Sequence, residues 1–93
     1  MPGWSGFTKE QIVSMGVVDA LRNGSADLDG IMSRAVVCSG VTPVDFNLAV
    51  EHLRYIGVVR SAPRSVLAML RRTPPIYQLN PDIVDPEYRA MNY

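Results

Sequence analysis

The hydrophobic pattern of this chain changes its period once, at Gly57. Before this glycine, apolar residues recur every three or four positions, which is the spacing of a buried helix face. After it, β-branched and aromatic residues favour two strands over 57–63 and 75–80, and prolines flank the segment between them. A chain of 93 residues builds one modest core. The predicted fold is therefore mainly α with a small β-hairpin, an α+β domain.

The first predicted helix begins after Thr8 and ends before Gly24. Thr8 and Gln11 have the spacing of a capping box, and Asn23 with Gly24 suits a helix end. Gly16 lies inside the helix, where it is costly unless another element approaches closely. The apolar stripe is wide enough that both flanks are expected to contact protein; it contains Ile12, Val13, Met15, Val17, Val18, Ala20 and Leu21.

The second predicted helix is capped by Ser25 and closed by Ser39 and Gly40. One face of it is apolar at helical spacing, formed by Leu28, Ile31, Met32 and Ala35.

The third predicted helix has the clearest start in the sequence. Thr42 is expected to cap it, Pro43 to occupy the first turn, and Asp45 to favour its positive end. Leu48 lies about 200° around the helix from Phe46, so it is expected to point away from the core. The inward face is predicted to contain Phe46, Ala49, Val50 and Leu53.

Two segments lie outside this framework. Residues 64–73, between the two strands, are too apolar for a bare hairpin tip, so a short helical turn or a partner contact is expected. Residues 81–93 form an acidic tail that is interrupted by Pro86. The predicted organisation is an arm over 1–7, a domain over 8–80 and a tail over 81–93.

The residue counts exclude several chemistries. With Cys38 as the one cysteine and His52 as the one histidine, neither a cysteine zinc site nor a two-histidine site is available. Glycine-rich phosphate loops, long apolar runs and the pattern of a secretory signal are missing from the sequence. A non-enzymatic, cytoplasmic protein is expected, with no cofactor, no metal, no catalytic residues and no membrane contact.

The order of elements resembles the winged helix-turn-helix superfamily. Its pattern has a glycine at the turn, an apolar residue next, and buried residues six and nine positions beyond, which here are Gly40, Val41, Phe46 and Ala49. The small residue expected four positions before the glycine is replaced by Val36. The resemblance covers residues 8–80. It implies a three-helix core with a two-stranded wing, duplex DNA as partner, and a third helix placed in the major groove.

The charges are distributed unevenly along the chain. Residues 1–53 contain three basic and six acidic side chains (net −3), and residues 54–81 contain five arginines and no acid (net +5). Residues 82–93 contain three acids and one arginine (net −2), so the sum is zero. The arginine block coincides with the predicted hairpin, where it would meet phosphate. A solvated arginine-rich turn is the alternative interpretation.

The leading functional prediction is a small transcriptional regulator that binds double-stranded DNA as a homodimer, with dimer surfaces on the first helix and at Tyr88, Met91 and Tyr93. The alternative is a winged-helix interaction module, a subunit or inhibitor of a larger assembly, that binds protein through Val44, Leu48 and Tyr55. A third hypothesis is single-strand or RNA binding by stacking on Tyr55 and Tyr77. The predicted nucleic-acid-binding residues are Thr42, Val44, Asn47, Leu48, Glu51, His52, Arg54, Arg60, Arg64, Arg71 and Arg72.

Overall fold

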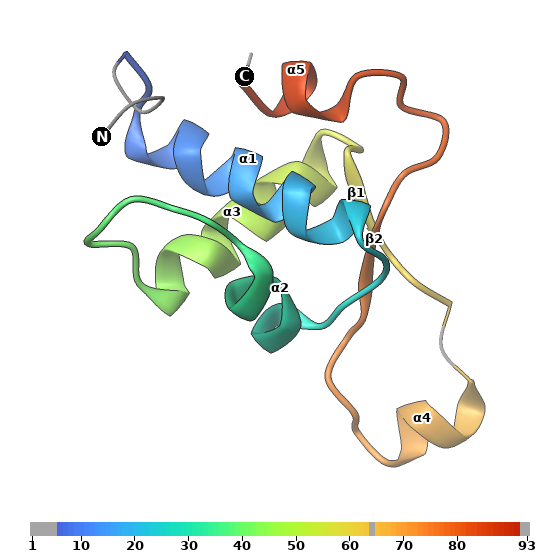
Figure 1. The fold of residues 1–93 in the computed structure, drawn as a ribbon. Helices are drawn as coiled ribbons and strands as arrows, with labels where there is room; N and C mark the ends of the chain where they lie inside the picture. The colour runs from blue at the N-terminus through green and yellow to red at the C-terminus, as the bar shows by residue number, and fades with distance from the viewer. Residues whose placement is uncertain (1–5, 64, 92–93) are drawn as a thin grey trace.

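The computed structural model describes residues 6–63 and 65–91, and it is mainly helical with a small two-stranded sheet (Figure 1). The elements are α1 (Lys9–Arg22), α2 (Leu28–Arg34), α3 (Pro43–Tyr55), β1 (Val59–Ser61), α4 (Val66–Leu70), β2 (Tyr77–Leu79) and α5 (Pro86–Met91).

Helix α1 is the centre of the core. It packs against α2, α3, α5 and β2, which explains why its apolar stripe is so wide. Side chains fully excluded from solvent come from α1, α2, α3 and α5 and from the residue before β1. They include Val17, Val18, Ile31, Val50, Leu53 and Val58. The predicted capping box is confirmed, because the Thr8 N–H donates to Gln11 Oε1 at 2.9 Å and the Gln11 N–H donates to Thr8 Oγ1 at 3.1 Å.

Gly16 allows another segment of the chain to approach α1 closely, as its position inside the helix predicted. A β-carbon at this position would lie 2.9 Å from Val37 Cγ1 and 3.4 Å from Ala35 Cβ. The chain after α2 therefore passes directly over the glycine. This contact is also the reason why a side chain at position 16 would disturb the packing.

The predicted limits of α2 are wrong at both ends. Its N-cap is Asp27, whose carboxylate accepts from the Gly30 N–H at 2.8 Å, and not Ser25. The cap moves because Ala26 is extended and exchanges two backbone hydrogen bonds with Tyr77, at 2.8 and 3.1 Å. The helix ends at Arg34, and residue 35 is already extended. Residues 35–42 then form a connection longer than the 3–4-residue turn of a helix-turn-helix.

The prediction for α3 is confirmed. Thr42 is the N-cap, Pro43 is in the first turn, and Gly57 follows the helix with a φ of +87°, a value that favours glycine. The four inward residues predicted from the sequence are all buried: Phe46, Ala49, Val50 and Leu53.

The predicted hairpin is present as a short antiparallel pair. Val59 lies opposite Leu79, Arg60 opposite Gln78, and Ser61 opposite Tyr77. Each strand occupies only the middle of its predicted segment. The residues between them include α4, which stands apart from the four other helices (Figure 1).

The chain after β2 returns to the core. Helix α5 packs along α1, Ala90 is fully buried, and Gln11 Nε2 donates to the Met91 carbonyl at 3.1 Å. Arg22 Nε also contacts Glu87 Oε1 at 2.9 Å. Burial, and then the nearby Glu87 carboxylate, raise the pKa of Asp19 beside this pair. The predicted dimer surface on α1 is thus largely covered by the chain itself.

Within the described residues, no helix is both long enough and apolar enough to cross a membrane.

Candidate functional site

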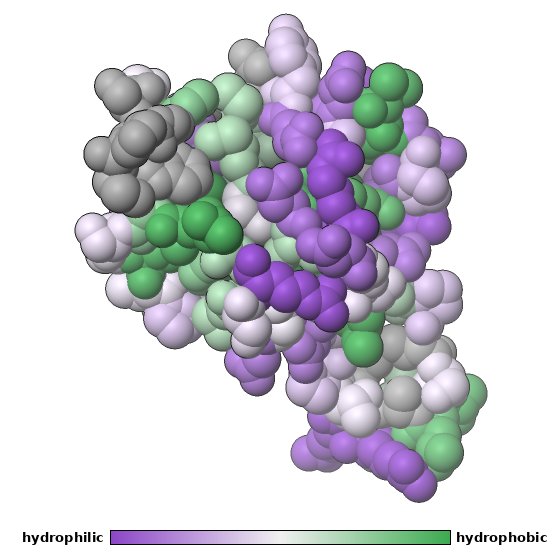
Figure 2. All heavy atoms as spheres, in the orientation of Figure 1, coloured by the Kyte–Doolittle hydropathy of each residue, from purple (hydrophilic) through white to green (hydrophobic). Residues whose placement is uncertain are grey.

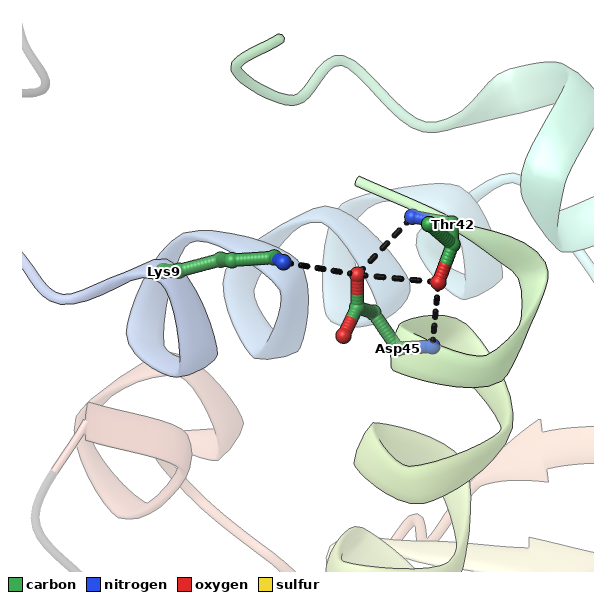
Figure 3. Close-up of polar contacts among 3 residues, drawn as sticks. All are labelled: Lys9, Thr42 and Asp45. Carbon is green, nitrogen blue, oxygen red and sulfur yellow. Dashed lines mark hydrogen bonds and ion pairs between the residues drawn. The ribbon is translucent and has the colours of Figure 1, made fainter. Parts of the chain in front are cut away.

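The start of α3 is held by a polar cluster that also ties it to α1 (Figure 3). Asp45 Oδ2 accepts from the Thr42 N–H at 2.8 Å and the Thr42 hydroxyl at 3.1 Å, and it lies 3.0 Å from Lys9 Nζ. The Asp45 N–H donates to Thr42 Oγ1 at 3.3 Å. The Thr42 N–H, followed by the Lys9 ammonium, lowers the pKa of Asp45. Thr42, predicted to touch nucleic acid, is therefore occupied as a cap.

The outward face of α3 is apolar at three of its positions. Val44 is 66% exposed, Leu48 is 62% exposed, and Tyr55 is 89% exposed. Asn47 and Glu51 lie exposed between them. The predicted orientation of Leu48, away from the core, is confirmed.

The charges at the end of α3 are engaged within the chain. Arg54 Nη1 lies 3.0 Å from Glu51 Oε1, and Arg54 Cζ lies 5.9 Å from the ring centroid of Tyr77. Tyr77 is buried, at 6% exposure. The hypothesis of stacking by both tyrosines is therefore wrong for Tyr77, because its side chain is packed in the hydrophobic core, whereas Tyr55 is accessible to a base.

A groove of about 240 Å³ runs between α1 and α3. His52, one of the predicted contact residues, is half-buried in it rather than displayed on the surface. The sequence did not predict this groove, because its two walls come from α1 and α3 and meet only where these helices cross in the folded chain. Its lining is Lys9, Glu10, Val13, Ser14, Asp45, Leu48, Ala49 and His52.

The predicted hairpin arginines lie away from this groove. Arg60 on β1 is exposed. With the Gln78 side-chain amide in the orientation that satisfies both its oxygen and its nitrogen, Gln78 Oε1 accepts from Arg60 Nε at 2.7 Å and from Arg60 Nη2 at 3.0 Å. Arg71 and Arg72 are exposed just after α4. Arg64 lies outside the described residues. The structure therefore places Val44, Asn47, Leu48 and Glu51 on the outward face of α3, with His52 in the groove. The described hairpin arginines form a second group.

Helix α4 contributes the largest apolar exposure of the hairpin. Val66, Leu67, Met69 and Leu70 are between 55% and 75% exposed. The sequence signal for this feature is the apolar run inside 64–73, which predicted a short helical turn or a partner contact. The helical turn is confirmed.

The described residues contain no cluster of three or more His, Cys, Asp or Glu side chains that could hold a metal ion. Comparison of the chain with protein-family models, curated proteins and solved structures finds no match in any of the three.

Proposed function

We propose that this chain is a protein-interaction module of the winged-helix type, and that its binding face is the outward face of α3. The observation that carries the proposal is the exposure of Val44, Leu48 and Tyr55 on that face, from 62% to 89%. Large apolar side chains exposed on one helix face favour a protein-binding site, and aromatic residues are enriched in such sites. The order of three helices and a hairpin supports the winged-helix class, although the connection over 35–42 is long for it.

The charges around α3 favour a protein over a polyanion. Within α3, whose residues are all described, the one arginine is paired with Glu51, and Asp45 is paired with Lys9. A helix that reads DNA normally presents Arg, Lys, Asn or Gln to base edges and basic groups to phosphates. Here Asn47 is flanked by Leu48 and Glu51 instead.

The test is a selection of binding peptides from a random library on the folded chain. Peptides that bind the α3 face should lose affinity at least about tenfold, or 1.4 kcal/mol, in Leu48→Asp. Val84→Asp is the control, because Val84 is 91% exposed outside α3. Selected peptides that bind Leu48→Asp and Val84→Asp equally well would contradict the proposal.

Duplex DNA binding is the second candidate function, and the hairpin favours it. Arg60, Arg71 and Arg72 are exposed in a segment that contains no acidic residue. If the two arginines after α4 contact phosphate, Arg71→Ala with Arg72→Ala should flatten the slope of log affinity against log salt by about two units. A wild-type chain that binds no duplex at low salt would rule this candidate out.

A further inference from the structure

The hairpin places an apolar helix where its own fold leaves it uncovered. Helix α4 is only five residues long, and its Val66, Leu67, Met69 and Leu70 are more than half exposed. So short a helix is not stable in water by itself, and its stability in proteins comes from packing of an apolar face. Figure 2 shows the hairpin end at the lower right as a hydrophobic patch beside a hydrophilic one. The arginines beside this patch are Arg71 and Arg72.

The groove between α1 and α3 has the complementary character. Val13, Ala49 and Leu48 supply apolar walls, and Glu10 in the lining supplies negative charge. Lys9 and Asp45, also in the lining, pair with each other, and Glu51, three residues after Leu48, is an exposed carboxylate that pairs with Arg54. Its volume of about 240 Å³ exceeds the ~150 Å³ cavity that accommodates benzene. One or two aliphatic side chains therefore fit into it.

We propose that the partner of the α3 face is a second copy of this chain, whose α4 docks in the α1–α3 groove with Arg71 and Arg72 beside Glu10 and Glu51. This inference rests on the proposed function, because the groove adjoins the α3 face and shares Leu48 with it. The copy's own α4 is held on the hairpin away from α1 and α3 (Figure 1), so the contact is between chains.

The charge distribution supports a second copy as the occupant. Residues 56–81, which include α4, contain four arginines and no acid, whereas α1 and α3, which form both walls of the groove, have a net charge of −1. Opposite potentials steer association and set its orientation. Each copy has one docking helix and one groove, so two copies can exchange helices around a two-fold axis.

The test is sedimentation velocity of the full chain with two variants that each damage one half of the contact. Leu67→Asp alters α4 and Leu48→Asp alters the groove, and both side chains are more than half exposed, so the fold should persist by circular dichroism. The wild type should self-associate, and each variant alone should be a monomer. An equimolar mixture of the two should form a two-chain complex, because one intact helix then meets one intact groove. Val84→Asp should associate like the wild type.

A charge-reversal series tests the orientation of the contact. Glu10→Lys with Glu51→Lys should weaken association at least about tenfold, as should Arg71→Glu with Arg72→Glu, because like charges then face each other. All four changes in one chain should restore it. Any one of three results would overturn the inference. The wild type could be a monomer, or Leu48→Asp could still self-associate. The third result is that neither the mixture of single variants nor the chain with all four charge reversals associates. Peptides that still bind the α3 face would then show that the proposed function survives without it.

Discussion

Helices α3 and α4 are both rich in aliphatic residues, but only α3 buries them. In α3, Val50 and Leu53 are fully buried, whereas in α4 the exposure of Leu67 is 55% and that of Leu70 is 75%. The same residue type therefore stabilises the fold in one helix and remains available to a partner in the other. Helix α3 shows the same division between its two faces. The contrast teaches that apolar content alone does not identify a core helix, since position relative to α1 decides it.

The largest effect should come from applying one substitution to both helices. Leu53→Ala removes a fully buried side chain from the core, so the free energy of unfolding should fall by about 2–5 kcal/mol. Leu70→Ala should change it by no more than about 0.5 kcal/mol, because the side chain is already in solvent. Urea denaturation of dilute protein measures both. Equal losses would break the comparison between the helices.

A second effect should appear where the chain crosses α1. Gly16→Val should reduce stability by about 1–3 kcal/mol, because its side chain would meet Val37 at a position where even a β-carbon lies 2.9 Å away. Shortening the neighbour in Gly16→Val with Val37→Ala should recover part of the loss. If the double variant were no more stable than Gly16→Val, the close approach would not be the cause.

The cap of α3 should contribute less. Thr42→Ala removes the hydroxyl that accepts from the Asp45 N–H, which should cost about 1 kcal/mol in a thermal or urea melt. Thr42→Ser keeps this acceptor and is expected to melt close to the wild type. A loss as large in Thr42→Ser as in Thr42→Ala would show that the hydroxyl is not responsible.

The smallest effect concerns pH. The folded pKa of Asp45 is lowered from 3.8, so the ionised carboxylate adds stability above that pH, and this contribution disappears as the pH falls through the folded pKa. Asp45→Asn should therefore lower Tm at pH 7, and the difference from the wild type should shrink below pH 3.8. Asp82→Asn, outside this cluster, serves as the control. A Tm difference that is independent of pH would contradict the role of the ionised Asp45 carboxylate, which accepts from the Thr42 N–H and pairs with Lys9.

Local signals in the sequence predicted α1 and α3 well. Capping boxes depend on residues three positions apart, and the inward face of α3 depends on helical spacing, so both can be read without tertiary contacts. The start of α2 was predicted wrongly because Ala26 pairs with Tyr77, which is distant in the sequence. The packing of α5 was missed for the same reason, since Ala90 is buried by residues at the other end of the chain.

The candidate site could likewise be predicted only where it depends on spacing within one helix. The exposure of Val44, Leu48 and Tyr55 follows from their angles around α3 relative to Phe46. The groove does not, because Glu10 and Val13 come from α1 and reach α3 only through the helix crossing. Long-range contacts, which no short pattern encodes, therefore set the shape of the site.

The central claim is that the outward face of α3 serves binding and not folding. Thermal melts of the wild type and Leu48→Ala at two protein concentrations about a hundredfold apart test it most directly, because association stabilises the folded state by mass action. The Tm of the wild type should rise with concentration, while Leu48→Ala should melt at the dilute wild-type Tm at both concentrations. A Leu48→Ala variant that melts far below the dilute wild type, as Leu53→Ala should, would contradict the claim.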